Sequence, residues 1–336
     1  MTSSVPHGGN LSAALQTFGG HRREWLDLST GINPTPYEFE PPGLDTWARL
    51  PEESALAALR DAAASAYGIS MDATVVVAGG TQAVIQSLPY CRPVSDVAVV
   101  GFTYAEHALA WHRAGHRVIA ATDLEQALEA EVVVLTNPNN PDGRSHSPGA
   151  LAHAADVLRR RGGLLVVDEA FADVDPAHSM ARCTNMDSMV VTRSFGKFFG
   201  LAGLRIGFAI TEPVLAERVR AQLGPWPVAG PSVAVATTAL RDLAWQQVQR
   251  LQLTRQHAGL CTVLRQAGLK ILGDTQLFTL VEHDNAQALW QHLAQRHILT
   301  RRFDERPIWL RFGLTSNAQA LSRLAGALAA YAEQAA

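Results

Sequence analysis

Residues that can do chemistry gather in one stretch of the chain, TRSFGKFFGLAGLRIGF at 192–208. Lys197 lies there in a turn rich in glycine and aromatic residues, with Ser194 three residues before it and Arg205 eight residues after it. A lysine in such a turn is a candidate for an amine that forms a covalent bond to a carbonyl group.

Two earlier segments add an amide and a carboxylate. TNPNNPDG at 136–143 contains Asn140, and LLVVDEAF at 164–171 places Asp168 at the end of an apolar run. The run predicts a buried parallel strand, and ligands of such sheets bind at the carboxyl ends of the strands. An amide, a carboxylate, a Ser-x-x-Lys pair and an arginine, in this chain order, are the contact groups of a pyridoxal phosphate site.

Each group meets a demand of that cofactor. Asp168 can pair with the ring nitrogen and keep it protonated, which makes the ring an electron sink. Asn140 can donate to the phenolic oxygen of the ring, and Lys197 would carry the cofactor covalently. Ser194 and Arg205 would hold its phosphate, Arg205 through planar, charge-assisted hydrogen bonds.

Two of these segments, each taken alone, are also typical of different structures. A strand that ends in Asp-Glu is found as the acidic metal-binding strand of a P-loop ATPase. That fold needs G-x-x-x-x-G-K-[ST], whereas here Val191 stands at the first glycine and Phe198 follows the lysine. NPNNPDG alone is typical of an ordinary turn. The order of the three segments together favours the cofactor site.

Composition and charge exclude several other classes. With 336 residues, 47% of them hydrophobic and 18% charged, the chain can form one large and one small domain. A net charge of −3 without a basic run gives no electrostatic footprint for nucleic acid or an anionic membrane. No signal pattern or membrane span is recognisable, so we expect a cytoplasmic protein. Cys91, Cys183 and Cys261 are far apart, so we expect no disulfide framework and no metal site.

Apolar runs alternate with Ala/Leu-rich helical stretches from about residue 50 to 230, which favours βαβ units and a mostly parallel sheet. The expected strands are 74–77, 97–100, 117–120, 132–135, 164–167, 189–191 and 206–210. GPWPVAGPS at 224–232 is the clearest domain boundary, because its prolines and glycines interrupt helices. Beyond it we expect one helix and a smaller α+β domain, with the helix at 233–266 and strands at 270–272, 278–281 and 308–312.

Over nearly its whole length the chain resembles the fold-type I pyridoxal phosphate superfamily, in the branch of histidinol-phosphate aminotransferases and threonine-phosphate decarboxylases. The matching segments are HGGN at 7–10, LDLSTGINP at 26–34, FTYAEH at 102–107, DEAF at 168–171, RSFGKFFGLAGLR at 193–205, GPWPVAGP at 224–231, RRFD at 301–304 and WLRFGL at 309–314. Together they are more similar to the decarboxylases. The resemblance implies an α/β fold with a seven-stranded, mostly parallel sheet in a large domain at 46–230. It also implies a small domain at 231–336 and an N-terminal arm at 1–45 that contributes to the small domain and the active site.

The resemblance implies further site residues, position by position. Tyr104 matches the aromatic residue that stacks on the cofactor ring, although a core aromatic is the alternative. The turn of Gly80, Thr81 and Gln82 matches the one whose amides bind the cofactor phosphate, in agreement with anion binding at helix N-termini. The substrate-binding candidates are His7, Asn33, Asn140, Arg302 and Arg311. Arg301 neighbours them, and surface ion pairing is an equal alternative for Arg301 and Arg302.

Four positions depart from the wider family pattern. Phe171 stands where most aminotransferases of this fold carry a tyrosine that donates to the ring oxygen. Leu50, in RLP, replaces a tyrosine that in relatives reaches the cofactor phosphate of the partner subunit. Gly196 replaces a serine or threonine that adds a phosphate contact, and Phe102 replaces a proline.

The resemblance implies a homodimer, with its active site near the subunit interface, that decarboxylates L-threonine O-3-phosphate to (R)-1-aminopropan-2-yl phosphate for cobalamin biosynthesis. Only the bond perpendicular to the cofactor ring can break, so the substrate carboxylate must be turned out of the ring plane by anchoring its phosphate elsewhere. Two alternatives are a histidinol-phosphate-type aminotransferase and a non-catalytic interaction module. Intact Lys197, Asp168 and Asn140 argue against the module.

Overall fold

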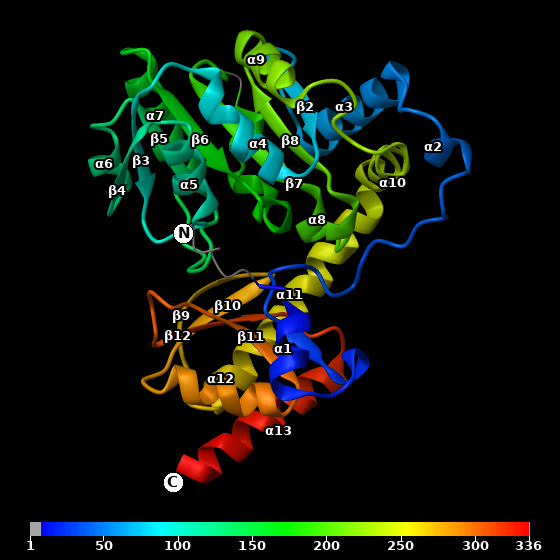
Figure 1. Cartoon of the computed structure of the whole chain (residues 1–336), viewed down its shortest axis with the longest axis vertical. Helices are drawn as coiled ribbons and strands as arrows, with labels where there is room; N and C mark the ends of the chain where they lie inside the picture. The colour runs from blue at the N-terminus through cyan, green and yellow to red at the C-terminus, as the bar shows by residue number, and fades with distance from the viewer. Residues whose placement is uncertain (1–7, 184, 336) are drawn as a thin grey trace. The chain divides into compact units, whose positions relative to one another are not determined.

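The computed structural model describes residues 8–183 and 185–335, whose contacts divide the chain into two compact units (Figure 1). The large unit comprises Pro36–Asn140 and Ser145–Gln247. The small unit comprises the described residues up to Thr35, Pro141–Arg144, and Val248 onward. Domain boundaries are expected from the sequence after residues 45 and 230, whereas the contacts place them after residues 35 and 247.

A seven-stranded sheet forms the centre of the large unit, in the spatial order β2-β8-β7-β6-β5-β3-β4 (Figure 1). Its strands are β2 (Thr74–Ala78), β3 (Asp96–Val100), β4 (Arg117–Ala121), β5 (Val132–Thr136), β6 (Leu164–Asp168), β7 (Met189–Ser194) and β8 (Gly207–Thr211). The strands from β4 to β7 pair in parallel, whereas β8 runs antiparallel to both β7 and β2. The mostly parallel sheet expected from the sequence is confirmed.

Helices cover both faces of this sheet (Figure 1). The helices of the large unit are α2 (Asp45–Ala48), α3 (Glu53–Tyr67), α4 (Thr81–Ser87), α5 (Glu106–Arg113), α6 (Leu124–Ala127), α7 (Pro148–Arg159), α8 (Phe195–Phe198), α9 (Pro213–Leu223) and α10 (Gly230–Arg241), of which α2 packs on α10 rather than on the sheet. Every residue of β5 and β6 is buried, as expected for central strands covered on both sides. On one face, Val132 and Val134 share a core with Val84 of α4 and Trp111 of α5.

The single helix expected over 233–266 is wrong, because the chain forms α10 and then α11 (Leu243–Gln266). Asp242 between them leaves the helical conformation, with ψ at 74°. Its side chain accepts a hydrogen bond of 2.9 Å from the backbone N–H of Trp245, so it caps the start of α11. Helix α10 packs on α3, which places it in the large unit rather than beyond a boundary at residue 230.

The small unit contains a five-stranded sheet in the order β1-β11-β12-β10-β9. Its strands are β1 (Leu26–Leu28), β9 (Lys270–Thr275), β10 (Phe278–Glu282), β11 (Ile298–Arg302) and β12 (Trp309–Gly313). Its helices include α1 (Leu11–Phe18), α12 (Ala286–Gln295) and α13 (Ala318–Ala335). Strand β1 pairs in parallel with β11, so segments from both halves of the chain share this sheet.

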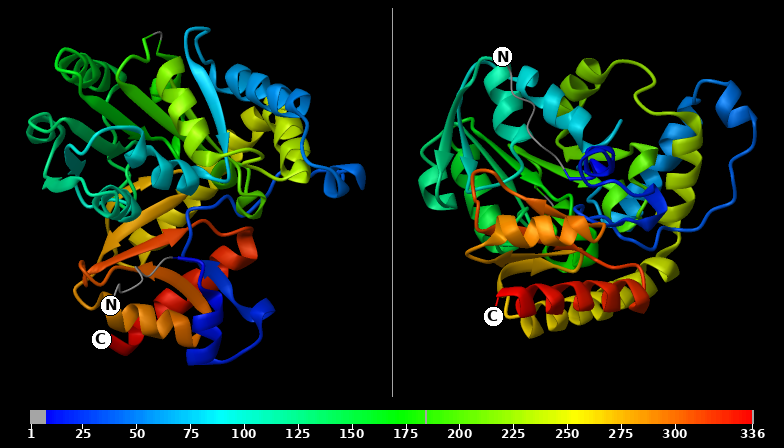
Figure 2. Two further views of the ribbon diagram at one scale, coloured as in Figure 1. Left: turned by 45° about the horizontal axis from the view of Figure 1, so that its top comes forward. Right: turned by 60° about the horizontal axis from the view of Figure 1, so that its bottom comes forward.

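Close packing of helices supports the small sheet. Figure 2 shows α13 running beside α11. A Cβ atom on Gly259 of α11 would lie 3.3 Å from Leu321 of α13, so the two helices approach closely there. Among the described residues, no helix combines the length and the apolar character needed to cross a bilayer.

Candidate active site

Three neighbouring strands of the large unit end in polar residues at one edge of the sheet. Asp168 at the end of β6 is in register with Thr136 of β5 and Thr192 of β7. Ser194 ends β7, and Lys197 follows at once in the short helix α8. Because parallel strands present their carboxyl ends at the same edge, the fold brings together side chains that are distant in sequence.

The Asp168 carboxylate is buried and held by three groups. Its Oδ1 atom accepts hydrogen bonds from the Thr192 hydroxyl at 2.9 Å and from the Ala170 backbone N–H at 3.1 Å. Its Oδ2 atom lies 2.9 Å from Nε2 of His107. The side chain is therefore fixed in one orientation, as a group that must meet a particular cofactor atom requires.

His107 is a site residue that the sequence analysis missed. It lies in the first turn of α5, is 1% exposed, and packs its ring edge to face against Tyr104, with centroids 6.1 Å apart. A histidine on an amphipathic helix is usually a core residue, so its type alone gave no signal. The backbone N–H of His107 donates to the carbonyl of Tyr104 at 3.2 Å in the turn that leads into α5, so the three-residue spacing from Tyr104 was the available clue.

Tyr104 joins this group to the first turn of α4. Its hydroxyl donates to Oε1 of Gln82 at 3.1 Å, and Nε2 of Gln82 donates to Glu106 at 3.0 Å. Burial, together with the nearby Glu106 carboxylate, raises the pKa of Tyr104 to about 12. The hydroxyl is therefore neutral at physiological pH, and the ring is held in place from both ends.

Arg205 lies against the backbone at the start of α4. A Cβ atom on Gly80 would lie 2.6 Å from Nη2 of Arg205, so only glycine lets the guanidinium come this close. Gly80 also has a φ of 84°, which glycine adopts readily. Similarly, a Cβ atom on Gly207 would lie 2.3 Å from the backbone nitrogen of Thr81. This cradle combines an arginine with helix N–H groups, the donor set that suits a phosphate.

The turn that carries Lys197 is packed against aromatic rings. Nζ of Lys197 lies 5.6 Å from the centroid of the Phe171 ring, and Phe195 stacks on Phe199 with centroids 4.3 Å apart. A Cβ atom on Gly196 would lie 2.6 Å from Cα of Ala202. The serine or threonine that relatives carry at this position would not fit here without a backbone shift.

The loop that carries Asn140 is tied to a neighbouring loop. Nδ2 of Asn139 donates to the backbone carbonyl of Phe102 at 3.0 Å, which joins the loop after β5 to the loop after β3. Asn140 itself is half-buried. The resemblance implies that relatives carry a proline at the position of Phe102. In this chain the hydrogen bond from Asn139 to the Phe102 carbonyl fixes the loop.

Behind the site lies a buried ion network that the sequence analysis also missed. Nη1 of Arg193 lies 2.9 Å from Glu169, and Nη2 lies 2.6 Å from Asp173. The side chains of Arg193, Glu169 and Asp173 are 1%, 0% and 4% exposed, respectively. The guanidinium of Arg193 lies over the ring of Tyr67. Burial raises the pKa of Glu169, although Arg193 opposes the shift. Because Glu169 follows Asp168, the network anchors the strand end that bears the site carboxylate.

The substrate-binding candidates of the small unit differ in their surroundings. Arg311 of β12 is buried, donates to the backbone carbonyl of Ser29 at 2.9 Å and lies over the Phe278 ring. Burial, with the nearby Arg301, lowers the pKa of Arg311 to about 9. Arg301 is directly opposite Arg311 in the sheet register.

Arg302 does not lie on the same face of the sheet as Arg301 and Arg311, so the expectation that it binds substrate together with Arg311 is not supported. Successive residues of a strand face opposite sides of the sheet. Arg302 is exposed, donates to Gln287 at 2.9 Å and lies over the ring of Trp290.

The two candidates of the N-terminal arm have different outcomes. Asn33 is 2% exposed, and its Oδ1 atom accepts from the Thr35 backbone at 2.9 Å and from Gln249 at 3.3 Å. Its oxygen therefore helps to shape the arm. His7 lies outside the described residues.

Comparison with known proteins identifies relatives of the whole chain. The family model for aminotransferase class I and II matches residues 44–328. A threonine-phosphate decarboxylase from a Sinorhizobium species and one from Pseudomonas aeruginosa are each 43% identical over 334 residues, which cover 98% of this chain and 99% of theirs. The crystal structure of the histidinol-phosphate aminotransferase from Clostridium acetobutylicum superposes with a TM-score of 0.82 at 20% identity and covers 91% of this chain and 99% of that one.

Proposed function

Since the chain belongs to the aminotransferase class I and II family, we propose that it is a pyridoxal phosphate-dependent carboxy-lyase acting on L-threonine O-3-phosphate. The product is (R)-1-aminopropan-2-yl phosphate, and the pathway is cobalamin biosynthesis in the cytoplasm. The observation that carries the proposal is the 43% identity to two threonine-phosphate decarboxylases over 98% of the chain. The polar groups at the edge of the large sheet are those that such a cofactor needs.

The large unit supplies each contact to the cofactor. When bound, pyridoxal phosphate provides an electron sink for the pair that a broken bond leaves on the substrate α-carbon. Asp168, which His107 and Thr192 hold in place, would pair with the ring nitrogen and favour its protonated form. Tyr104 would cover the ring face, and Asn140 would donate to the ring oxygen.

Phosphate binding and proton transfer fall to the residues around α8. Arg205, Ser194 and the N–H groups of Thr81 and Gln82 bind the cofactor phosphate. Lys197 would carry the cofactor, and its Nζ atom would be the group that donates a proton to the substrate α-carbon. Breaking the bond to the carboxylate, rather than to the α-proton, requires an anchor for the substrate phosphate.

Arg311 is the strongest candidate for that anchor in the small unit. Burial lowers the pKa of Arg311, which means that the folded protein destabilises the charged form of its side chain. An anionic ligand bound to Arg311 would stabilise that charged form. Asn33 lies in the same unit and is proposed as a second contact. The structure gives no support for Arg302 in this role, because its side chain faces the other side of the sheet.

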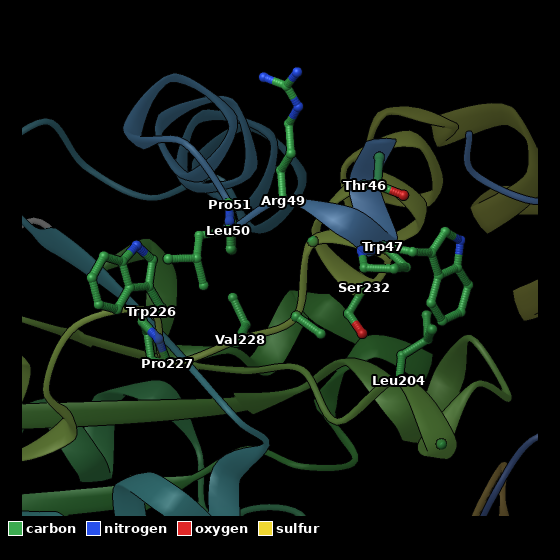
Figure 3. Close-up of a pocket in the computed structure, with 14 residues that line it drawn as sticks. Thr46, Trp47, Arg49, Leu50, Pro51, Leu204, Trp226, Pro227, Val228 and Ser232 are labelled. Carbon is green, nitrogen blue, oxygen red and sulfur yellow. The ribbon is translucent and has the colours of Figure 1, made fainter. Parts of the chain in front are cut away.

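We also propose that the protein is a homodimer whose interface lies beside the cofactor phosphate. The large unit has a pocket of about 640 Å³, with Trp47 and Trp226 on opposite sides of it and Leu50 and Val228 between them (Figure 3). The two tryptophans and Leu50 are 66%, 54% and 61% exposed. Apolar surface of this extent on a soluble protein usually binds a partner.

The pocket is next to the phosphate cradle. Leu204, which precedes Arg205, lines the pocket, and a Cβ atom on Gly79 would lie 3.3 Å from the backbone oxygen of Pro227. A second copy seated here would lie beside Gly80 and Arg205. Trp226→Glu should give monomers by light scattering and weaken cofactor binding, whereas Met71→Glu, at a fully exposed residue outside the pocket, should do neither. A dimeric Trp226→Glu protein would place the interface elsewhere.

The decisive experiment compares two reactions of the purified protein. One measures carbon dioxide released from O-phospho-threonine, with unphosphorylated threonine as the control. The other measures glutamate formed from histidinol phosphate and 2-oxoglutarate. We expect fast release from the phosphorylated substrate only, because unphosphorylated threonine lacks the group that is proposed to anchor and orient the substrate. Faster glutamate formation would overturn the decarboxylase assignment and favour the aminotransferase.

A further inference from the structure

Three ligand-type side chains of the small unit converge on one point. His257 and Cys261 are four residues apart on α11, and Asp274 lies on β9. Sγ of Cys261 lies 3.3 Å from Nε2 of His257, and Oδ1 of Asp274 lies 3.7 Å from the same nitrogen. The three ligand atoms all lie within 4.8 Å of one another.

The two separations that involve His257 Nε2, 3.3 Å and 3.7 Å, lie close to the edge length of a zinc coordination tetrahedron. With bonds of about 2.3 Å to sulfur and about 2.0–2.2 Å to nitrogen and oxygen, tetrahedral ligand atoms lie roughly 3.3–3.6 Å apart. Two ligands four residues apart on one helix face are a recurring arrangement in metal sites. We propose that His257, Cys261 and Asp274 bind a divalent transition metal ion, preferentially zinc, with water as the fourth ligand.

The geometry argues against a catalytic Cys-His-Asp triad. In a triad the nucleophile and the carboxylate contact opposite nitrogens of the imidazole ring. Here Cys261 and Asp274 both approach Nε2 of His257. One nitrogen cannot form good hydrogen bonds to both groups at once, whereas a metal ion placed between the three atoms satisfies all of them.

Burial and charge suit an ion that clips α11 to β9. Cys261 is 3% exposed, and the side chains of His257 and Asp274 are 16% and 38% exposed, so one side remains open to water. A thiolate and a carboxylate would neutralise the ion. The remaining ligand, the imidazole of His257, binds a metal ion in its neutral form.

Two other groups near Cys261 affect the site in opposite ways. Thr279 of β10 lies 3.6 Å from Sγ and can donate to the thiolate. Burial raises the pKa of Cys261, so metal binding must displace a proton from it. Burial lowers the pKa of His257, as does the charge of Arg265, which would also repel the ion.

The test measures zinc binding to the untagged, cofactor-loaded protein under reducing conditions. Equilibrium dialysis should find one Zn²⁺ ion per chain, and zinc should raise the thermal unfolding temperature. Cys261→Ser should weaken binding by roughly 100-fold or more, beyond the 10–100-fold effect of outer-shell changes. Cys91→Ser, at a second buried cysteine outside the cluster, should leave it unchanged.

Two further measurements guard against misfolding and adventitious binding. Asp274→Asn, a substitution of similar size at a side chain that is 38% exposed, should weaken zinc binding at least about tenfold while unfolding at the normal temperature without zinc. With Co²⁺, the wild-type protein should show a thiolate-to-cobalt charge-transfer band that Cys261→Ser lacks. Equal zinc affinity in the wild type and Cys261→Ser, or no bound zinc in either, would overturn the proposal. Neither result depends on decarboxylase activity.

Discussion

Replacing Asp168 by asparagine should abolish most of the turnover but leave the fold intact. The asparagine oxygen can still accept from Thr192 and Ala170, at the position of the Oδ1 atom. Its amide can donate to Nε2 of His107, provided that the imidazole proton moves to Nδ1. Because all three contacts survive, the free energy of unfolding should fall by less than about 1.5 kcal/mol.

The catalytic loss has a different origin and a larger size. Removing one partner of a buried charge pair costs about 3–5 kcal/mol. At about 1.4 kcal/mol for each factor of ten, carbon dioxide release from O-phospho-threonine should slow by roughly two to three orders of magnitude. The assay is run at saturating cofactor, alongside denaturant unfolding of the same protein.

The matched control is Thr192→Val, which keeps the carboxylate and removes only one of its hydrogen bonds. Its rate should fall by no more than about tenfold, the equivalent of one hydrogen bond. If Asp168→Asn keeps a rate within tenfold of the wild type, Asp168 is a structural residue at a strand end. If the variant fails to fold, the tautomer argument for His107 is wrong.

Three other substitutions test separate parts of the structure. Arg205→Lys should raise the dissociation constant of the cofactor at least about tenfold in a cofactor titration, because a lysine cannot reproduce the planar contact; an unchanged constant would remove Arg205 from the phosphate site. Arg193→Met should lower the free energy of unfolding by about 3–5 kcal/mol in urea, because Glu169 and Asp173 lose their buried cation, and a loss below about 1 kcal/mol would show that the network is dispensable. Arg311→Met should lose activity, yet it should unfold at the same or a higher temperature at pH 7. Burial lowers the pKa of Arg311 to about 9, so below that pH the folded state is destabilised by the buried charge, which methionine lacks. The cost of burying the charge decreases as pH rises above 9, so the difference in unfolding temperature between Arg311→Met and the wild type should shrink there. A clearly lower unfolding temperature of Arg311→Met at pH 7 would instead show that Arg311 is a structural residue.

Most of the large unit could be predicted because its signals are local. Apolar runs bounded by turns predicted the seven strands, and the order of Asn140, Asp168 and Lys197 along the chain is the basis of the proposed cofactor site. Parallel strands align their ends at one edge, so the sequence order of the strand ends already implied their proximity.

Residues whose role depends on a distant partner could not be predicted. His107 acquires its role only because α5 brings it to Asp168, 61 residues away. Arg193 finds Glu169 through the pairing of two strands, and no local pattern distinguishes this buried arginine from an exposed one. Asp274 meets His257 and Cys261 across a helix and a strand, so cysteine spacing gave no hint of a metal site.

The strands of the small unit were harder to predict from the sequence for a different reason. Strand β1 has only three residues, too few for an alternating pattern, and β11 ends in two arginines that interrupt its apolar run. The pairing of β11 with β12 decides which of those arginines shares a face with Arg311. Two adjacent arginines look equivalent in sequence, and only the strand register separates them.

The pairing of β1 with β11 sets an order of events during synthesis. Leu26 is in register with Ile298, so β1 cannot pair with β11 until about 270 more residues have been synthesised. At roughly 5–20 residues per second, that delay lasts about 15–55 s. The large unit has most of its own contacts within 36–247 and can fold during this time, whereas the N-terminal segment must remain unpaired. A ribosome-bound chain halted before β11 should therefore expose the N-terminal arm to protease while the seven-stranded sheet is already protected.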